Sequence, residues 1–213
     1  MEHGLDHFFI LTEPGAPQAD LLVAAGFEEG ERNRHNGQGT ANRRFFFADT
    51  MLELLYVVDE AEANQGRGHR LRLPERASNA DASPFGLVLR ESAEPGSPRF
   101  SGWKYFPEYL PDGGFLRIGH NSNELAEPLC IALPPNFPKV LGKAPQRRAH
   151  SRVTALCISV PVNQPSEILE SMARIEPISL RFGEPHRMEV ILDHGTLGKK
   201  TDFRPRLPLL VRW

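Results

Sequence analysis

The sequence predicts an α+β protein built from two modules, each with the order strand, helix and three strands. Two observations carry this prediction. The first sixty residues alternate apolar, strand-like runs with turn signals around one helix-compatible stretch, and the last sixty residues repeat that order. We therefore divide the chain into a first βαβββ module at 1–60, intervening strands and loops at 61–150, and a second, degenerate βαβββ module at 151–213.

The first module has the clearest pattern. Residues 5–11 form a compact apolar run with one histidine inside it, which is typical of a strand. A short helix is predicted at 18–25, where Gly26 is placed to end it. Three strands follow at 27–35, 40–48 and 51–58, separated by a glycine-rich turn at 36–39 and by Asp49 and Thr50.

The remaining elements are predicted from shorter patterns. In the second module a strand at 152–160 precedes a helix that begins at Pro165, and strands follow at 178–182, 188–192 and 207–213. Between the modules, 60–82 is polar and predicts a loop or short helix. Short strands are expected at 85–90, 115–119 and 128–133, and four prolines between 134 and 145 indicate a linker.

Composition narrows the class of partner. The chain has 213 residues, 40% of them apolar and 24% charged, with a formal net charge of −2, so it has no general attraction to nucleic acid or anionic membrane. Cys130 and Cys157 each lie in an apolar run and are expected to be free, buried thiols. We find no secretion signal and no apolar run of membrane-spanning length, and we expect a cytoplasmic protein.

Three short motifs carry a resemblance to a known family. They are Leu5-Asp6-His7-Phe8-Phe9-Ile10, then a segment from His35 to Arg43 that contains Gly39-Thr40-Ala41-Asn42, and finally Leu52-Glu53-Leu54-Leu55. In this order the motifs resemble the glyoxalase-like domain branch of the vicinal-oxygen-chelate superfamily. The resemblance implies mixed sheets that curl around a cavity, metal-assisted chemistry on small oxygenated molecules, and pairing of two chains as a homodimer.

Two polar residues stand inside apolar strands. On a regular strand His7 shares one face with Leu5, Phe9 and Leu11. A buried imidazole needs a partner, so His7 either hydrogen-bonds in the core or faces a cavity. Glu53 lies between two leucines, and a carboxylate there either faces a pocket or stands on an exposed edge strand.

The resemblance implies that His7 is a metal ligand, which with Glu53 supplies an imidazole and a carboxylate to zinc, iron, manganese or nickel. A facial triad needs a second histidine. When the two modules are laid over each other, Leu156 falls near the place of His7 and Pro208 or Leu209 near that of Glu53, and none of these can bind a metal. His35, His120 and His186 are then the candidates for a further ligand.

Other residues are candidates for binding a ligand. His35, Thr40 and Asn42 flank the glycine turn, where they either satisfy backbone groups or line the mouth of the cavity. Trp103 leads an aromatic cluster that either packs as core or roofs a pocket, and His120 follows it closely.

Three functions are consistent with these residues. The first is a metal-dependent lyase, isomerase or dioxygenase that acts on a small oxygenated substrate, with Glu53 as metal ligand or general base and His7 as ligand. The second is a metal-free small-molecule binding protein similar to the bleomycin-resistance type. The third is a scaffold subunit with an inherited, inactive cavity, so enzymatic activity stays open at this point.

Overall fold

The computed structural model describes residues 4–91, 100–135, 137 and 151–213. Its thirteen described strands are β1 (Gly4–Leu11), β2 (Asn33–His35), β3 (Thr40–Phe46), β4 (Met51–Val57), β5 (Phe85–Arg90), β6 (Gly102–Tyr105), β7 (Leu116–Gly119), β8 (Leu129–Leu133), β9 (Val153–Val160), β10 (Ile178–Phe182), β11 (Arg187–Leu192), β12 (Lys200–Asp202) and β13 (Leu209–Arg212). The α-helices are α1 (Ala19–Ala24), α2 (Glu60–Gln65), α3 (Leu73–Ser78) and α4 (Glu167–Met172), and short 3-10 turns lie at His69–Leu71, His120–Asn123 and Asp193–Gly195.

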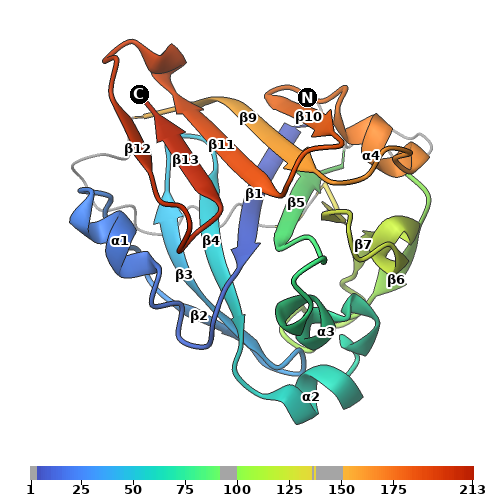
Figure 1. The fold of residues 1–213 in the computed structure, drawn as a ribbon. Helices are drawn as coiled ribbons and strands as arrows, with labels where there is room; N and C mark the ends of the chain where they lie inside the picture. Colours follow the sequence, from blue (N-terminus) through green and yellow to red (C-terminus); the bar gives the residue numbers. More distant parts are fainter. Residues whose placement is uncertain (1–3, 92–99, 136, 138–150) are drawn as a thin grey trace.

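The strands form two mixed sheets, which confirms the predicted fold class (Figure 1). The larger has eight strands in the order β2-β3-β4-β1-β5-β8-β7-β6, and the smaller has five in the order β10-β9-β11-β13-β12. In the larger sheet β1 pairs in parallel with β4 and antiparallel with β5. The strands of the intervening segment, β5 to β8, therefore extend the sheet that β1 to β4 begin.

The larger sheet uses its two faces differently. Phe8 and Ile10 of β1 belong to a core that also holds Leu156 and Ile158 of β9, so the C-terminal sheet packs on this face. Phe9 lies in a second apolar cluster on the other face, beneath the segment of α2 and α3. Alternation along the strands produces this division, and each fully buried aliphatic or aromatic side chain contributes about 1.5–3 kcal/mol.

A β-bulge interrupts the alternation at the start of β1. Leu5 is paired with Leu89 and His7 with Val88, so Asp6 is an extra residue opposite the continuous strand β5. Leu5 consequently packs against the inter-sheet core rather than on the face of His7 and Phe9. The predicted placement of Leu5 on the same face as His7 is therefore wrong, because a bulge reverses the facing of the residues before it.

Several elements differ from their predicted extent. The strand expected at 27–35 is reduced to β2, with an isolated bridge between Glu29 and Phe45 before it. The polar segment 60–82 forms α2 and α3. Strands β6 and β12 were not predicted, since each has only three or four residues. The linker prolines Pro138 and Pro145 lie outside the described residues.

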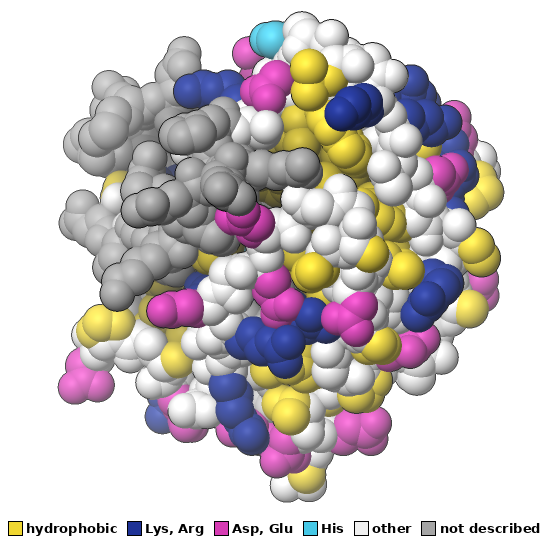
Figure 2. Space-filling view, turned by 90° about the vertical axis from the view of Figure 1, so that its left-hand side faces the viewer, with side chains coloured by type: hydrophobic (Ala, Val, Ile, Leu, Met, Phe, Trp, Pro, Cys, Tyr) yellow, Lys and Arg dark blue, Asp and Glu magenta, His cyan; other side chains and the backbone are white. Residues whose placement is uncertain are grey.

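The distribution of surface charge and the length of the helices are relevant to the kind of partner the chain can have. Figure 2 shows basic and acidic side chains intermixed over one face of the molecule, with apolar side chains between them. Within the described ranges, no helix has the length and apolar character needed to cross a membrane.

A buried network of charged and polar groups ties the intervening segment to the C-terminal part. Glu127, which is 2% exposed, accepts hydrogen bonds from the Asn121 amide, the Ser166 backbone N–H and the Ser166 hydroxyl. Ser166 in turn caps the N-terminus of α4 by accepting from the Leu169 N–H. Arg76 is 4% exposed and donates to backbone carbonyls of the same loop, including that of Glu127.

We predict that Glu127→Ala lowers the free energy of unfolding by about 2–4 kcal/mol, because it leaves the buried donors of Asn121 and Ser166 without a hydrogen-bond acceptor. Urea denaturation measures the change. Glu124→Ala is the matched control, since Glu124 is exposed in the same loop and should alter stability by less than about 0.5 kcal/mol. Equal losses in the two variants would contradict the structural role of Glu127.

Candidate functional site

A cavity of about 310 Å³ lies on the face of the larger sheet opposite the C-terminal sheet. The residues that line it all fall between 7 and 137, so none of the described residues of 151–213 contributes to it. The polar lining residues are His7, Asn33, His35, Gln38, Arg44, Glu53, Tyr105 and Tyr109. The remaining walls are apolar and come mainly from β4, β7, β8 and the leucines at 71 and 73.

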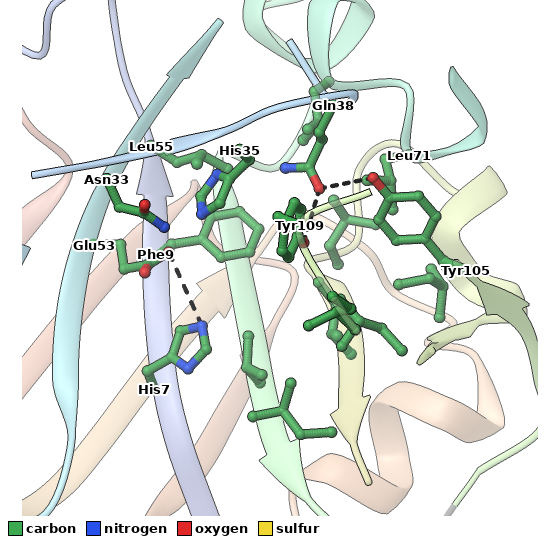
Figure 3. A pocket seen from close by; sticks show the side chains of 18 of the residues that line it. His7, Phe9, Asn33, His35, Gln38, Glu53, Leu55, Leu71, Tyr105 and Tyr109 are labelled. Atoms are coloured by element: carbon green, nitrogen blue, oxygen red, sulfur yellow. Dashed lines mark hydrogen bonds and ion pairs between the residues drawn. The ribbon is translucent and has the colours of Figure 1, made fainter. Parts of the chain in front are cut away.

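His7 and Glu53 face each other across one corner of the cavity (Figure 3). Nε2 of His7 is 4.0 Å from Oε2 of Glu53. The other side of each group is occupied: Asp6 lies 2.8 Å from Nδ1 of His7, and the Asn42 amide donates to Oε1 of Glu53 at 3.0 Å. Because a carboxylate only accepts, Nδ1 of His7 carries a proton and Nε2 is directed to the cavity.

The bulge in β1 makes the pair of Asp6 and His7 possible. Neighbouring residues on a regular strand point to opposite faces, whereas an extra residue bends the strand and re-aims its side chains. Arg90 of β5 fixes the Asp6 carboxylate, with Nη2 2.5 Å from Oδ2. Hydrogen bonds from His7 and Arg90 outweigh burial, which acts in the opposite direction, and keep the pKa of Asp6 below its ordinary value.

The two histidines of the cavity have pKa values shifted in opposite directions. Burial acts to lower the pKa of His7, but the charge of Glu53 and the hydrogen bond with Asp6 together raise it above 6.5. Burial lowers the pKa of His35 below its ordinary value; the charge of Glu53 acts to raise it, and the charges of His7 and Arg44 act with burial. Near neutral pH, His7 is therefore shifted toward imidazolium and His35 toward neutral imidazole.

A second set of hydrogen bonds lies across the cavity from Glu53. The hydroxyls of Tyr105 and Tyr109 both donate to the side-chain oxygen of Gln38, and the Gln38 amide donates to Thr40. Thr40 also lies 3.0 Å from Nδ1 of His35. Burial raises the pKa of both tyrosines, so they remain neutral phenols. This network fixes the part of the lining that Figure 3 shows around Gln38.

The structure brings together some of the predicted site residues and not others. His7, His35 and Glu53 line the cavity, whereas Thr40 and Asn42 are fully buried behind it and position His35 and Glu53. Trp103 and His120 do not line the cavity. The Trp103 ring lies under Arg70 and its indole donates to Ser122, while His120 turns to solvent in the 3-10 helix after β7.

Other cavity residues were missed or only partly indicated by the sequence. Tyr105 and Tyr109 belong to the aromatic cluster headed by Trp103, which was expected either in the core or over a pocket. Gln38 gave no signal because it lies in the predicted turn at 36–39, where polar residues are ordinarily exposed, and Arg44 gave none because it follows Arg43 directly in the predicted strand at 40–48. Asp6 gave none because a regular strand would place it away from His7.

These donors do not fit the metal centre that the resemblance implies. Zinc and non-haem iron centres use three or four protein ligands. In the part of the chain that the structure describes, no group of three or more His, Cys, Asp and Glu residues could hold a metal ion. His186, one candidate for a further ligand, instead lies against the backbone of Asp81. The assignment of a divalent metal to His7 and Glu53 therefore stays a prediction that this donor set does not support.

Comparison with known proteins agrees with the fold. Residues 5–94 match the family model described as a glyoxalase-like domain. This segment is similar to a glyoxalase-like domain. The match runs from β1 through β5 and contains His7, His35 and Glu53, so the resemblance inferred from the motifs is confirmed. A search of curated proteins finds no match.

Solved structures extend the comparison beyond this glyoxalase-like segment. A hypothetical protein from Staphylococcus aureus has a TM-score of 0.60 at 10% identity, with 99% of this chain and 98% of that chain covered. A hypothetical protein from Bacillus halodurans C-125 has a TM-score of 0.39 at 14% identity, with 65% and 98% covered. The first likeness shows that the whole chain, including the C-terminal sheet, shares a fold with another protein.

The opposite shifts of His7 and His35 predict separate titrations. We expect the pKa of His7 above 6.5 and that of His35 below 6.5, measured by NMR from the imidazole resonances as pH is varied. Glu53→Gln should lower the pKa of His7, because the Glu53 charge is the largest cause that raises it. Glu13→Gln is the control, since Glu13 is exposed and outside the cavity lining.

The sign of the accompanying stability change follows from linkage. A histidine whose pKa is higher in the folded state adds stability below the unfolded value of about 6.5. That contribution is lost as pH rises through the folded pKa of His7. A His7 resonance that titrates below 6.5, or that ignores Glu53→Gln, would contradict the electrostatic coupling of the pair.

Proposed function

We propose that the chain is an enzyme that moves a proton on a small carbonyl compound bound in the cavity, with Glu53 as the base and His7 as the proton donor. The facing of His7 and Glu53 across 4.0 Å, in the polar corner of a largely apolar cavity, is the observation that supports it. A gap of this length between a donor and an acceptor is too wide for a direct hydrogen bond. It can instead be bridged by a substrate group.

The partners of the two groups suit these roles. Asn42 holds one oxygen of Glu53 and leaves the other directed at His7 and the cavity. Asp6 holds Nδ1 of His7, so that Nε2 presents its proton when the ring is imidazolium. An acid and a base with fixed orientations contribute about 10²–10⁴-fold each to a proton transfer.

The reaction is balanced without any further reagent. Glu53 takes a proton from the carbon next to the substrate carbonyl, and the C–H electron pair forms a carbon–carbon double bond. The carbonyl oxygen takes the proton of His7 as the π pair moves onto it. Return of a proton from Glu53 to the same carbon, and of the enol proton to His7, re-forms the carbonyl and exchanges the substrate proton with solvent. In a substrate with a second carbon–carbon double bond conjugated with the enol, return of the proton to the far carbon of that system completes an isomerisation. The apolar walls hold the carbon skeleton and limit water.

A metal-free binding protein is the second candidate. The hydrogen bonds of two lining residues favour it, since Gln38 receives two tyrosine hydroxyls and Glu53 already has Asn42 as partner. Such a network keeps its shape without turnover. A binder and an enzyme differ in one respect that can be measured: only the enzyme exchanges a substrate proton with solvent. Pairing of two chains into a homodimer likewise stays a prediction.

The test uses 1-phenyl-2-propanone, a neutral ketone with an apolar ring, in deuterium oxide. We expect the protein to accelerate deuterium incorporation next to the carbonyl, followed by proton NMR. Glu53→Gln and His7→Gln should each slow the exchange by about 10²–10⁴-fold, because each removes one proton-transfer group. Glu13→Gln, exposed and remote from the lining, should exchange at the rate of the unaltered protein.

Two outcomes would count against the proposal. If the ketone raises the melting temperature but no exchange above background occurs, the chain is a binding protein. If dialysis against a chelator abolishes exchange and zinc or another divalent ion restores it, proton transfer by His7 and Glu53 alone is wrong. We expect exchange to survive the chelator.

A further inference from the structure

Arg44 of β3 is a charged side chain in the cavity lining for which the proposed proton transfer has no use. It is 7% exposed and lies directly opposite Glu53 in the antiparallel pairing of β3 with β4. The two side chains nevertheless form no ion pair within 4.0 Å among the described residues. A guanidinium this deeply buried is ordinarily paired, because removing its charge from water is costly.

The Arg44 side chain is held by groups that leave its outer edge available. Its Nε donates to the backbone oxygen of Glu31 at 2.5 Å, and its guanidinium carbon lies 5.4 Å from the centre of the Phe46 ring. Phe46 packs against Gly30, where an added Cβ would lie 2.3 Å from a ring carbon. In the described chain neither terminal nitrogen of Arg44 has a hydrogen-bond or ion-pair partner. Both remain free to donate to one ligand.

The charges around this corner favour an anion. Arg44 is a cation, and His7 is shifted toward imidazolium, while Glu53 is the acidic residue of the cavity lining. Arg44 and His35 both line the cavity, and the Arg44 charge acts to lower the pKa of His35. A carboxylate matches two parallel N–H donors of an arginine better than any neutral group does.

We propose that the cavity takes a small carboxylic acid with an apolar body, whose carboxylate pairs with the two terminal nitrogens of Arg44. The apolar body lies against the opposite wall, where Leu71, Ile118 and Ile131 are among the lining residues. A cavity of about 310 Å³ is at the small end of ligand pockets, so the body is a single ring or a short chain.

This inference deepens the proposed function and rests on it only for the reaction that follows binding. With its carboxylate on Arg44, a bound acid has its neighbouring carbons close to Glu53, since the two residues face each other across paired strands. A carbonyl between the carboxylate and the body can then reach His7. The substrate class is therefore a 2-oxo acid with an apolar side chain.

The experiment compares an acid with its neutral counterpart. Isothermal titration calorimetry measures the Kd of 3-phenylpropanoate and of 3-phenylpropanamide, which have the same body and nearly the same shape. We expect the acid to bind the unaltered protein at least tenfold more tightly than the amide. Arg44→Gln should reduce that ratio to near one, and Arg44→Lys should leave an intermediate ratio, since lysine keeps the charge without the planar fork.

Arg181→Gln is the matched control, because it removes one exposed positive charge on β10, away from the cavity lining, and should keep the full preference. The comparison in the unaltered protein decides the question even if an Arg44 variant does not fold. Equal affinities for acid and amide, no binding of the acid, or a preference that survives Arg44→Gln would each overturn the inference.

The binding measurement is independent of turnover. If the acid preference depends on Arg44 but 1-phenyl-2-propanone shows no exchange, the proposed proton transfer is wrong and the carboxylate site stands. If exchange depends on Glu53 but the acid has no advantage over the amide, proton transfer stands and Arg44 does not anchor a carboxylate.

Discussion

Strand β1 separates the core from the cavity: one of its faces packs against the C-terminal sheet and the other lines the cavity. The arrangement of both sheets and of the site depends on which side chains it directs to each face. It pairs with β4 on one side and β5 on the other, so it joins the two halves of the larger sheet. One of its faces carries Phe8 and Ile10 into the core shared with the C-terminal sheet. The other carries His7 and Phe9 to the cavity. A change in register of one residue would exchange these faces and bury His7 between the sheets.

The bulge at Asp6 places a carboxylate beside the ring of His7, which the regular alternation of a strand does not allow. A histidine directed at a cavity needs an acceptor on Nδ1 to fix its tautomer, and that acceptor has to lie beside the ring. The bulge supplies Asp6 from the adjacent position in the chain, and Arg90 of β5 neutralises the added carboxylate. The irregularity in β1 is therefore tied to the orientation of a cavity side chain, which is where such bulges are commonly found.

The parts of this fold that the sequence predicted are local, and the parts that it missed depend on pairing between distant segments. Residues 85–90 and 178–182 were predicted as strands and form β5 and β10 within those bounds, because apolar β-branched and leucine-rich runs show their own periodicity. Nothing in residues 85–90 indicates that they pair with β1. The cavity roles of Gln38 and Arg44 depend on that pairing and on α2 and α3, so they could not be read from the chain.

His7 and Glu53 could be predicted because burial of a polar group leaves a pattern: each is a charged or polar residue inside an apolar strand. Trp103 was chosen because it leads an aromatic cluster, and His120 because it follows that cluster closely in sequence. Proximity does not determine direction, and after β7 the chain turns His120 to solvent. The neighbour of Trp103 on the same strand, Tyr105, has the hydroxyl that reaches Gln38.

The position of the C-terminal sheet restricts the chemistry of the cavity. Because β9, β11 and β13 pack on the far face of β1 and β4, the Leu156 and Leu209 positions are core residues and supply no side chain to the cavity. Every charge there comes from the larger sheet. On β1, β3 and β4 these are His7, Arg44 and Glu53, two of them cationic or shifted toward the cation. Since Asp6 compensates His7, the cation without a paired carboxylate is Arg44, and this is the basis for the anionic ligand that we propose.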